Sequence, residues 1–212
     1  MLESLYLVRH GEVENPDHVV YADLPGFSLS PIGRAQAAAA AQRLEPLQPE
    51  AVISSPLDRA VETAAAIAGA VGIAVTTDDR LVEWRLSGRW AGVGWEDLPQ
   101  RFPGEMEAYL ATPYDLPFAP ETADEVARRM ASLVGDLERR GLRSAVLVSH
   151  QDPVQALRIH LQAAPPHSFL VGKPGHASVV TLERSDAGWV ETGYWEPDFA
   201  SDPFPPPPDS GS

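Results

Sequence analysis

Three short apolar runs in this chain are each followed within a few positions by polar side chains suited to anion chemistry. The runs cover residues 5–8, 52–53 and 146–148. Each is bounded by polar or turn-forming residues and is predicted to form a short buried strand. The side chains that follow the three runs include two arginines and two histidines: Arg9, His10, Arg59 and His150.

Two alanine-rich segments lie between the first and third of these runs. Residues 31–44 are predicted to form a helix, with Ser30 as its N-cap and Pro46 just beyond its end. Residues 57–71 are predicted to form a second helix that ends at Gly72.

The clearest amphipathic helix is predicted over residues 122–140. Thr122 and Glu125 have the spacing of a capping box, and Gly141 follows the last helical position. A further helix is expected over residues 152–162, directly after the third apolar run.

Strands and helices therefore alternate along most of the chain. A short strand is predicted over 73–75, and segments 178–183 and 189–194 flank the turn sequence 185–188 and form a hairpin. This alternation predicts an α/β fold, a three-layer α/β/α sandwich with a mostly parallel central sheet and antiparallel pairing at the final hairpin. Ligands of such sheets bind beyond the carboxyl ends of the strands, where the four cationic and imidazole side chains are expected to meet.

The length of the chain suits one domain, expected over residues 1–200. Residues 79–120 are the least regular part, with scattered prolines and three tryptophans, and are predicted to form a lid-like insertion. The segment 201–212 includes four consecutive prolines and is predicted to be an extended or disordered tail.

The charge of the chain constrains its partners. The formal net charge is −14, and Lys173 is the single lysine, so nearly all positive charge is arginine. No basic surplus exists to neutralise a nucleic-acid backbone, and nucleic-acid binding is not expected. An anion site in so acidic a protein must concentrate its positive charge locally, with Arg9 and Arg59 as the main candidates.

The chain contains no cysteine, so disulfides, thiolate metal sites and cysteine nucleophiles are excluded. The N-terminus has no basic segment followed by a long apolar core, and no apolar run approaches the ~18 residues of a membrane span. A cytoplasmic protein without membrane association is therefore expected.

Two arginines gathered in one crevice favour a phosphate ligand, because guanidinium groups match phosphate oxygens in pairs. A histidine beside them is a candidate nucleophile toward phosphorus. The remaining histidines are His18, His160, His167 and His176. They have no metal-ligand spacing and are expected to be structural or surface residues, with His18 at the cleft mouth. The expected chemistry needs no metal and no cofactor.

Four segments, in order from about residue 5 to residue 161, resemble the histidine phosphatase superfamily, branch 1, which includes the cofactor-dependent phosphoglycerate mutases. They are Arg9-His10-Gly11-Glu12, the stretch 29–37 (LSPIGRAQA), the stretch 54–64 (SSPLDRAVETA) and Val148-Ser149-His150. Each stands at an expected junction between strand, loop and helix. A phosphoglycerate mutase-like fold is therefore implied.

The resemblance implies a reaction and a set of catalytic residues. His10 would attack phosphorus and form a phosphohistidine, while Arg9, Arg59 and His150 would hold the phosphoryl oxygens. Glu83 follows the family pattern Leu-x-Glu and would protonate the leaving alkoxide. Asp152 is a rival for that role, because another branch of the superfamily uses an aspartate just after the second histidine.

The chain also departs from the family pattern near the expected pocket. The glycine after Glu83 comes one residue late, at Gly88, and Asn15 stands one place earlier than the usual asparagine. Asn15 would either bind a phosphate oxygen or shape the turn before Pro16. Gln151 replaces the glycine that often follows the second histidine and is a candidate substrate contact.

The residues after Glu83 are candidates for a substrate wall. Trp84 and Trp90 could stack on a sugar or aromatic group, and Arg85 and Arg89 could pair with a second anion; the alternative is an ordinary packed loop.

The function expected from these features is a metal-independent phosphomonoesterase (EC 3.1.3.-) that acts on a small phosphorylated metabolite. The alternatives are a phosphoglycerate mutase (EC 5.4.2.-), a protein phosphohistidine phosphatase, and a catalytically silent phospho-ligand-binding protein. Mutases of the family carry a longer insertion with a Glu-Arg-His-Tyr-Gly-like motif, where this chain has Glu83-Trp84-Arg85-Leu86-Ser87, which favours hydrolysis. A homodimer would use the edge of the terminal hairpin or the region around Trp189 and Trp195.

Overall fold

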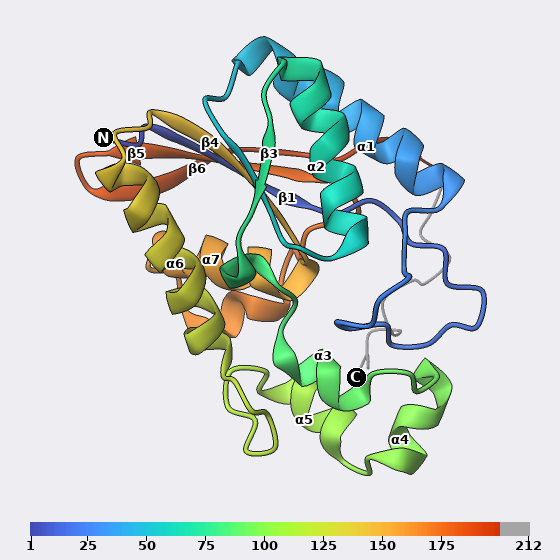
Figure 1. Cartoon of the computed structure of the whole chain (residues 1–212). Coiled ribbons are helices and arrows are strands. Elements are labelled where there is room, and N and C mark those ends of the chain that lie inside the picture. Colours follow the sequence, from blue (N-terminus) through green and yellow to red (C-terminus); the bar gives the residue numbers. More distant parts are fainter. Residues whose placement is uncertain (200–212) are drawn as a thin grey trace.

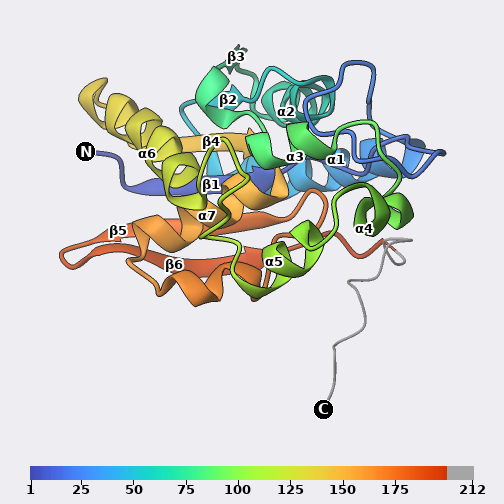
Figure 2. The ribbon, with the colours of Figure 1, turned by 90° about the horizontal axis from the view of Figure 1, so that it is seen from below.

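One six-stranded sheet organises the computed structural model, which describes residues 1–199. Its strands follow in the order β3-β2-β4-β1-β5-β6, visible across the molecule from below (Figure 2). The strands are β1 (Ser4–Arg9), β2 (Val52–Ser54), β3 (Val75–Thr77), β4 (Ser144–Ser149), β5 (Val179–Ser185) and β6 (Gly188–Trp195). The first four run parallel, β5 pairs antiparallel with β1, and β6 pairs antiparallel with β5. The mostly parallel sheet with an antiparallel hairpin is confirmed.

Helices cover both faces of this sheet, as predicted (Figure 1). The longer ones are α1 (Pro31–Leu44), α2 (Asp58–Val71), α6 (Ala123–Arg139) and α7 (Gln151–Leu161). Alternate residues of β1 separate the two faces: Tyr6 and Val8 pack in the core with α1 and α2, while Leu5 and Leu7 belong to the core with α6 and α7. This period of two is what a strand buried on both faces requires.

The strand register brings the carboxyl ends of β1, β2 and β4 to the same edge of the sheet. In β1 and β4, Arg9 stands opposite Ser149, and in β2 and β4, Ser54 stands opposite Val148. The pairing continues one residue further, because the backbone N–H of His10 donates to Ser149 at 3.0 Å and that of Ser55 donates to Val148 at 2.9 Å. The three predicted motifs therefore meet at the carboxyl ends of neighbouring strands.

The helix caps follow the sequence signals. Ser30 caps α1, accepting from the backbone N–H of Gly33 at 2.9 Å, and Thr122 with Glu125 forms the predicted capping box of α6. Gly72 ends α2 in the left-handed region, with φ of 73°. The strand predicted over 73–75 lies instead at Val75–Thr77, because the N–H of Ile73 still bonds to Ala68 of the helix end.

Residues 79–120 fold into short helices rather than an irregular loop. They contain α3 (Arg85–Trp90), α4 (Leu98–Arg101), α5 (Glu105–Ala111) and the 3₁₀ turns η2 (Asp79–Leu81) and η3 (Trp95–Asp97). Two more 3₁₀ turns, η1 (Glu45–Leu47) and η4 (Pro166–Leu170), lie elsewhere in the chain. In both views α3, α4 and α5 form one group beside the carboxyl ends of the parallel strands (Figures 1 and 2).

This group contacts the loop that follows the first motif. The N–H of Val20 donates to Val93 at 2.9 Å, and the N–H of Gly92 donates to Val20 at 2.8 Å. The predicted tail, residues 201–212, lies outside the described residues. Of the surfaces considered for a homodimer, Trp189 is buried, at 6% exposure, whereas edge strand β6 exposes Val190 and Tyr194.

Candidate active site

Two buried histidines face each other at the carboxyl edge of the sheet. His10 directly follows β1 and His150 directly follows β4, and their ring centroids lie 5.1 Å apart. Both side chains are almost completely enclosed, at 1% and 0% exposure. The predicted convergence of the first and last motifs is therefore realised.

His10 is held in one tautomer by its own loop. Its Nδ1 lies 2.7 Å from the carbonyl oxygen of Gly11, which can only accept, so Nδ1 carries the proton and Nε2 keeps its lone pair. Burial lowers the pKa of His10 well below its usual value, and the nearby charge of Arg59 lowers it further. A neutral imidazole with a free Nε2 is the form that a nucleophile needs.

The segment 29–37 packs closely against the loop that follows β1 and carries His10. A Cβ added to Gly11 would lie 2.4 Å from the carbonyl oxygen of Gly33, so the two glycines allow a backbone approach that other residues would block. Gln36 accepts the backbone N–H of Glu12 at 2.8 Å, and the hydroxyl of Ser30 donates to the Glu12 carboxylate at 2.6 Å. The loop that carries His10 is thus fixed by the start of α1.

His150 bonds to the loop after β2. Its Nε2 lies 2.9 Å from the hydroxyl of Ser55, while its buried Nδ1 has no hydrogen-bond partner and lies 3.9 Å from Oε2 of Glu83. Burial, followed by the charge of Arg59, lowers the pKa of His150 well below its usual value. A buried ring nitrogen without a partner is costly unless a ligand completes it.

Arg9 and Arg59 supply the positive charge of the site. Arg9 donates from Nη1 to the carbonyl oxygen of Pro174 at 3.0 Å, and its Nη2 lies 2.7 Å from Nε2 of His176. Arg59 is 1% exposed, donates to the carbonyl oxygen of Ala22, and lies 4.7 Å from the centre of the Tyr21 ring.

Neither arginine is neutralised by a carboxylate within residues 1–199, where every described ion pair involves other cations. The Nε of each is buried and makes no hydrogen bond. Two guanidinium groups whose Nε donors are unused form a site for an anion.

Glu83 stands beside His150 as a carboxyl group poised to hold a proton. Its side chain is only 14% exposed, and Oε1 accepts the backbone N–H of Trp84 at 2.7 Å. Burial raises the pKa of Glu83 to about 7, and the negative charge of Asp152 contributes in the same direction. Glu83 therefore changes protonation state near neutral pH, as a group that both gives and takes a proton requires.

Asp152, the rival acid, is engaged elsewhere. Its carboxylate accepts from Lys173 at 2.6 Å and from the hydroxyl of Tyr109 at 3.1 Å and 3.2 Å. These bonds engage both carboxylate oxygens, which makes Asp152 the weaker candidate for a proton donor.

Asn15 and Gln151 were both candidates for contact with the ligand, and the structure gives them different surroundings. Asn15 closes a turn, because its amide donates to Val19 at 2.8 Å and accepts from the N–H of Val19 at 3.2 Å. The turn-shaping alternative therefore describes its contacts. Gln151 donates to Pro174 at 3.2 Å, the same carbonyl that Arg9 contacts, so its amide lies next to the anion site.

The structure corrects the expectation that Trp84 and Trp90 form a substrate wall after Glu83. Trp84 is 1% exposed, donates from its indole N–H to Glu121 at 2.6 Å, and packs against Tyr109 and Phe169. Trp90 is also buried, at 3% exposure. These rings fill the junction between the short helices and the sheet and leave no open face for stacking, as the packed-loop alternative described.

The two arginines of the expected wall lie on α3. Arg89 pairs with Glu105 of α5 at 2.6 Å and lies 5.1 Å from the centre of the Phe102 ring, so its anionic partner is a residue of this chain. Arg85 is exposed.

Several residues of the site escaped the sequence analysis: Tyr21, Ser55, Tyr109, Lys173 and His176. His176 was expected to be structural or on the surface, yet its ring lies 5.9 Å from that of His10 and its Nε2 contacts Arg9. No spacing rule links positions so far apart in the chain. The one signal available in the sequence was that Lys173 is the single lysine of the chain.

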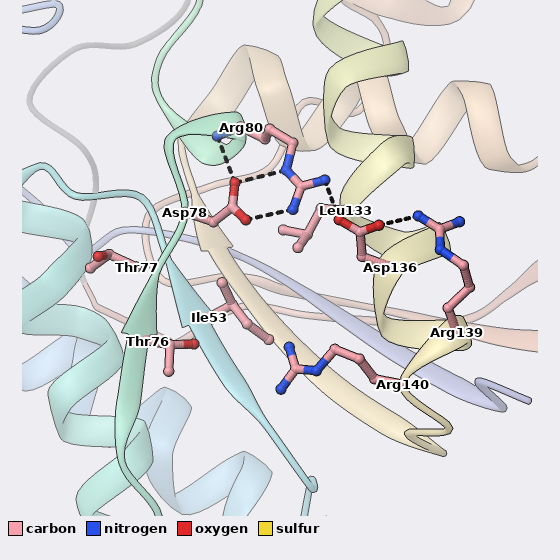
Figure 3. Close-up of a pocket in the computed structure, with 9 residues that line it drawn as sticks. All are labelled: Ile53, Thr76, Thr77, Asp78, Arg80, Leu133, Asp136, Arg139 and Arg140. Atoms are coloured by element: carbon pink, nitrogen blue, oxygen red, sulfur yellow. Dashed lines mark hydrogen bonds and ion pairs between the residues drawn. The ribbon is translucent and has the colours of Figure 1, made fainter.

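An open groove of about 440 Å³ lies away from these residues, between β3 and α6 (Figure 3). Arg80 on its wall is held by Asp78 at 2.7 Å and Asp136 at 2.6 Å, and Asp136 also pairs with Arg139. The charged groups there largely satisfy one another, which distinguishes the groove from the histidine site.

Residues 1–199 contain no group of three or more potential ligands among His, Cys, Asp and Glu that could hold a metal ion. In the same part of the chain, no helix combines the length and apolarity needed to cross a bilayer.

The half-buried His176 is expected to make stability depend on pH. Burial and Arg9 lower the pKa of His176 to about 2, from an ordinary value of 6.5. A depressed pKa contributes stability that is present above 6.5 and is lost as the pH falls toward 2, because the unfolded chain then binds the proton first. Between pH 6.5 and 5, this one group should remove about 2 kcal/mol.

Urea unfolding of the wild type and of His176→Asn at about pH 7.5 and about pH 5 tests this expectation. The difference in unfolding free energy between the two proteins isolates His176 from Glu83, whose raised pKa acts in the opposite direction. It should move by about 2 kcal/mol in favour of the variant as the pH falls. An unchanged difference would contradict a neutral His176 in the folded protein.

Comparison with known proteins adds independent information. The sequence profile of the histidine phosphatase superfamily (branch 1) matches residues 5–196. Glucosyl-3-phosphoglycerate phosphatase of Mycobacterium tuberculosis is 32% identical over 212 residues, which cover 93% of this chain and 89% of the relative. Phosphoserine phosphatase 1 of Hydrogenobacter thermophilus is 31% identical over 156 residues, covering 73% and 74%.

The fold comparison agrees. The native structure of a mycobacterial glucosyl-3-phosphoglycerate phosphatase superimposes with a TM-score of 0.80 at 29% identity, over 90% of this chain and 97% of that one.

Proposed function

Because this chain belongs to branch 1 of the histidine phosphatase superfamily, we propose that it is a metal-independent phosphomonoesterase acting on a small phosphorylated metabolite through a phosphohistidine on His10. The observation that carries the proposal is a pair of arginines around a neutral His10, one half-buried and one buried, whose Nε atoms are enclosed without a hydrogen bond and which form no ion pair with a carboxylate in the described chain. The relatives named above support it, because their names describe phosphatases of small metabolites.

The first half-reaction transfers the phosphoryl group to the protein. Nε2 of His10 attacks phosphorus in line, the bond between phosphorus and the ester oxygen breaks, and the leaving oxygen takes a proton from Glu83. In the second half-reaction Glu83, now a carboxylate, removes a proton from water as that water attacks phosphorus. The nitrogen–phosphorus bond breaks, phosphate leaves, and both residues return to their starting states.

The other site residues stabilise the charge that builds on the phosphoryl oxygens. Arg9 and Arg59 present their unused N–H groups, and His150 presents the ring nitrogen that lacks a partner. His150 is also the N-cap of α7, so the first N–H groups of this helix add a favourable dipole. Each such donor is typically worth ~3–4 kcal/mol of barrier.

A phosphate-release assay tests the proposal. Wild type and His10→Ala are compared on sugar phosphates, nucleotides, phosphoserine, p-nitrophenyl phosphate, and 3-phosphoglycerate with and without 2,3-bisphosphoglycerate, in the presence of EDTA. We expect release that depends on His10, is unaffected by EDTA and is inhibited by vanadate, which mimics the trigonal-bipyramidal phosphoryl group.

The other outcomes separate the alternatives. Loss of activity in EDTA would contradict the metal-independent reaction. Conversion of 3- to 2-phosphoglycerate without release would identify a mutase. Phosphate binding without turnover on any ester would favour the silent phospho-ligand binder.

A further inference from the structure

The single lysine of the chain lies in a polar cluster between three segments. Lys173 follows η4, Asp152 lies in the first turn of α7, and Tyr109 lies on α5. The Lys173 ammonium contacts Asp152 at 2.6 Å, donates to the hydroxyl of Tyr109, and lies 4.7 Å and 5.0 Å from the ring centres of Tyr109 and Phe169. The side chains of Lys173 and Asp152 are only 15% and 14% exposed, so solvent screens this ion pair weakly.

The cluster adjoins the candidate proton donor. Asp152 follows His150 by two residues, and Nδ1 of His150 lies 3.9 Å from Oε2 of Glu83. The charge of Asp152 acts on Glu83. The Tyr109 ring lies 6.2 Å from the ring of Trp84, the residue that follows Glu83, and the charge of Glu83 acts on Tyr109. The ionisable groups that act on the Glu83 carboxyl or lie against the Glu83 backbone are Arg9, Tyr21, Arg59, Tyr109, Arg129, His150 and Asp152.

Among those groups, Asp152 is the one anion that raises the pKa of Glu83, while Arg9 and Arg59 lower it. The arginines are committed to the phosphoryl group in the proposed reaction, and their influence on Glu83 falls when an anionic substrate binds. The side-chain partners of Asp152 in the described chain are Lys173 and Tyr109, and its net effect on Glu83 depends on how far Lys173 neutralises it.

We propose that Asp152 and Lys173 are opposed positioning residues that set the protonation of Glu83, with Asp152 holding the proton on Glu83 and Lys173 limiting that effect. This inference rests on the proposed function of Glu83 as acid and base. Two opposite charges a few ångströms apart act on a third buried group with opposite signs, because each changes the free energy of its ionised form. Tyr109 completes the pair by fixing the Asp152 carboxylate toward the short helices.

The sign of each substitution follows. Asp152→Asn removes the negative charge while keeping the shape, so the ionised form of Glu83 becomes easier to form and its pKa falls. Lys173→Met removes the compensating positive charge, so the pKa of Glu83 rises. Lys173→Arg keeps the charge and is the matched control. Shifts of about one pH unit are expected when one charge that acts on a buried carboxyl is removed.

NMR of the full-length protein labelled with ¹³C at the glutamate carboxyl measures Glu83 directly. Its resonance is assigned by its absence in Glu83→Gln. The titration midpoint is expected near 7 in the wild type, about one unit lower in Asp152→Asn, about one unit higher in Lys173→Met, and unchanged in Lys173→Arg. The alkaline limb of kcat/KM for an alkyl phosphate should move in the same order.

The proposal is overturned if both charge-removing variants move the Glu83 midpoint in the same direction, or if neither moves it. A purely structural role of the ion pair would lower stability or kcat without opposite shifts. Should Lys173→Met fail to fold, Lys173→Gln removes the same charge and takes its place in the comparison. The NMR titration does not depend on turnover, so failure of the phosphatase assay and failure of this proposal are separate results.

Discussion

Replacing His10 with alanine is expected to abolish turnover while leaving the protein folded. The imidazole provides the nitrogen that attacks phosphorus in the proposed reaction, with Nδ1 fixed on Gly11 and the lone pair of Nε2 available. Loss of a nucleophile typically lowers kcat by a factor on the order of 10⁴–10⁶, since binding and charge stabilisation alone remain. The measurement is kcat on the best substrate of the panel, with folding checked by circular dichroism.

Two further variants serve as controls for this experiment. His160→Ala removes an exposed histidine at the end of α7 and should retain full activity. His10→Gln keeps polar volume in the enclosed position if alanine destabilises the loop. Rapid quenching of the wild type should trap an acid-labile phosphoryl group on His10. Normal turnover by both His10 variants would remove this residue from the reaction.

Glu83→Gln is expected to have the second largest effect, and its size should depend on the leaving group. An alkyl phosphate releases a strongly basic alkoxide that needs a proton, so loss of the acid should lower kcat/KM by roughly 10²–10⁴-fold. p-Nitrophenyl phosphate releases a weakly basic phenolate and should lose far less. The ratio of the two losses measures the contribution of proton donation.

The pH profile gives a second signature of Glu83. In the wild type, activity on an alkyl phosphate should fall as the pH rises through about 7, because the acid then loses its proton. In Glu83→Gln this limb should disappear. Glu107→Gln, which alters an exposed carboxyl on α5, is the matched control and should keep the wild-type profile. Equal losses on both ester types would assign Glu83 another role.

Much of the architecture was predictable because it depends on local patterns. The alternating burial of β1, the capping box at Thr122 and the left-handed Gly72 each act over a few residues. The meeting of His10 and His150 was also predictable, because parallel strands end at one edge of a sheet and both residues directly follow strands. Strand 73–75 was displaced by two residues because helix α2 extends its hydrogen bonding to Ile73.

The contacts made by the other side chains near the site were not predictable from local patterns. Trp84 and Trp90 are equally plausible as substrate contacts and as core residues until the packing of α3 and α5 decides where they lie. Asn15 had two roles open to it, and the loop conformation around Val19 selected the turn. Arg89 was a candidate anion ligand until Glu105 came within 2.6 Å.

The sequence by itself thus determined the sheet, its helical layers, and the arrival of Arg9, His10, Arg59 and His150 at one edge, because strand periodicity and chain direction suffice for these. Only the tertiary structure decided which additional groups surround them. His176 reaches Arg9 across 167 positions, and Lys173 reaches Tyr109 across 64. Such contacts depend on how loops close over the sheet, and no local pattern encodes that geometry. They nevertheless set the charge and the protonation on which the proposed chemistry depends.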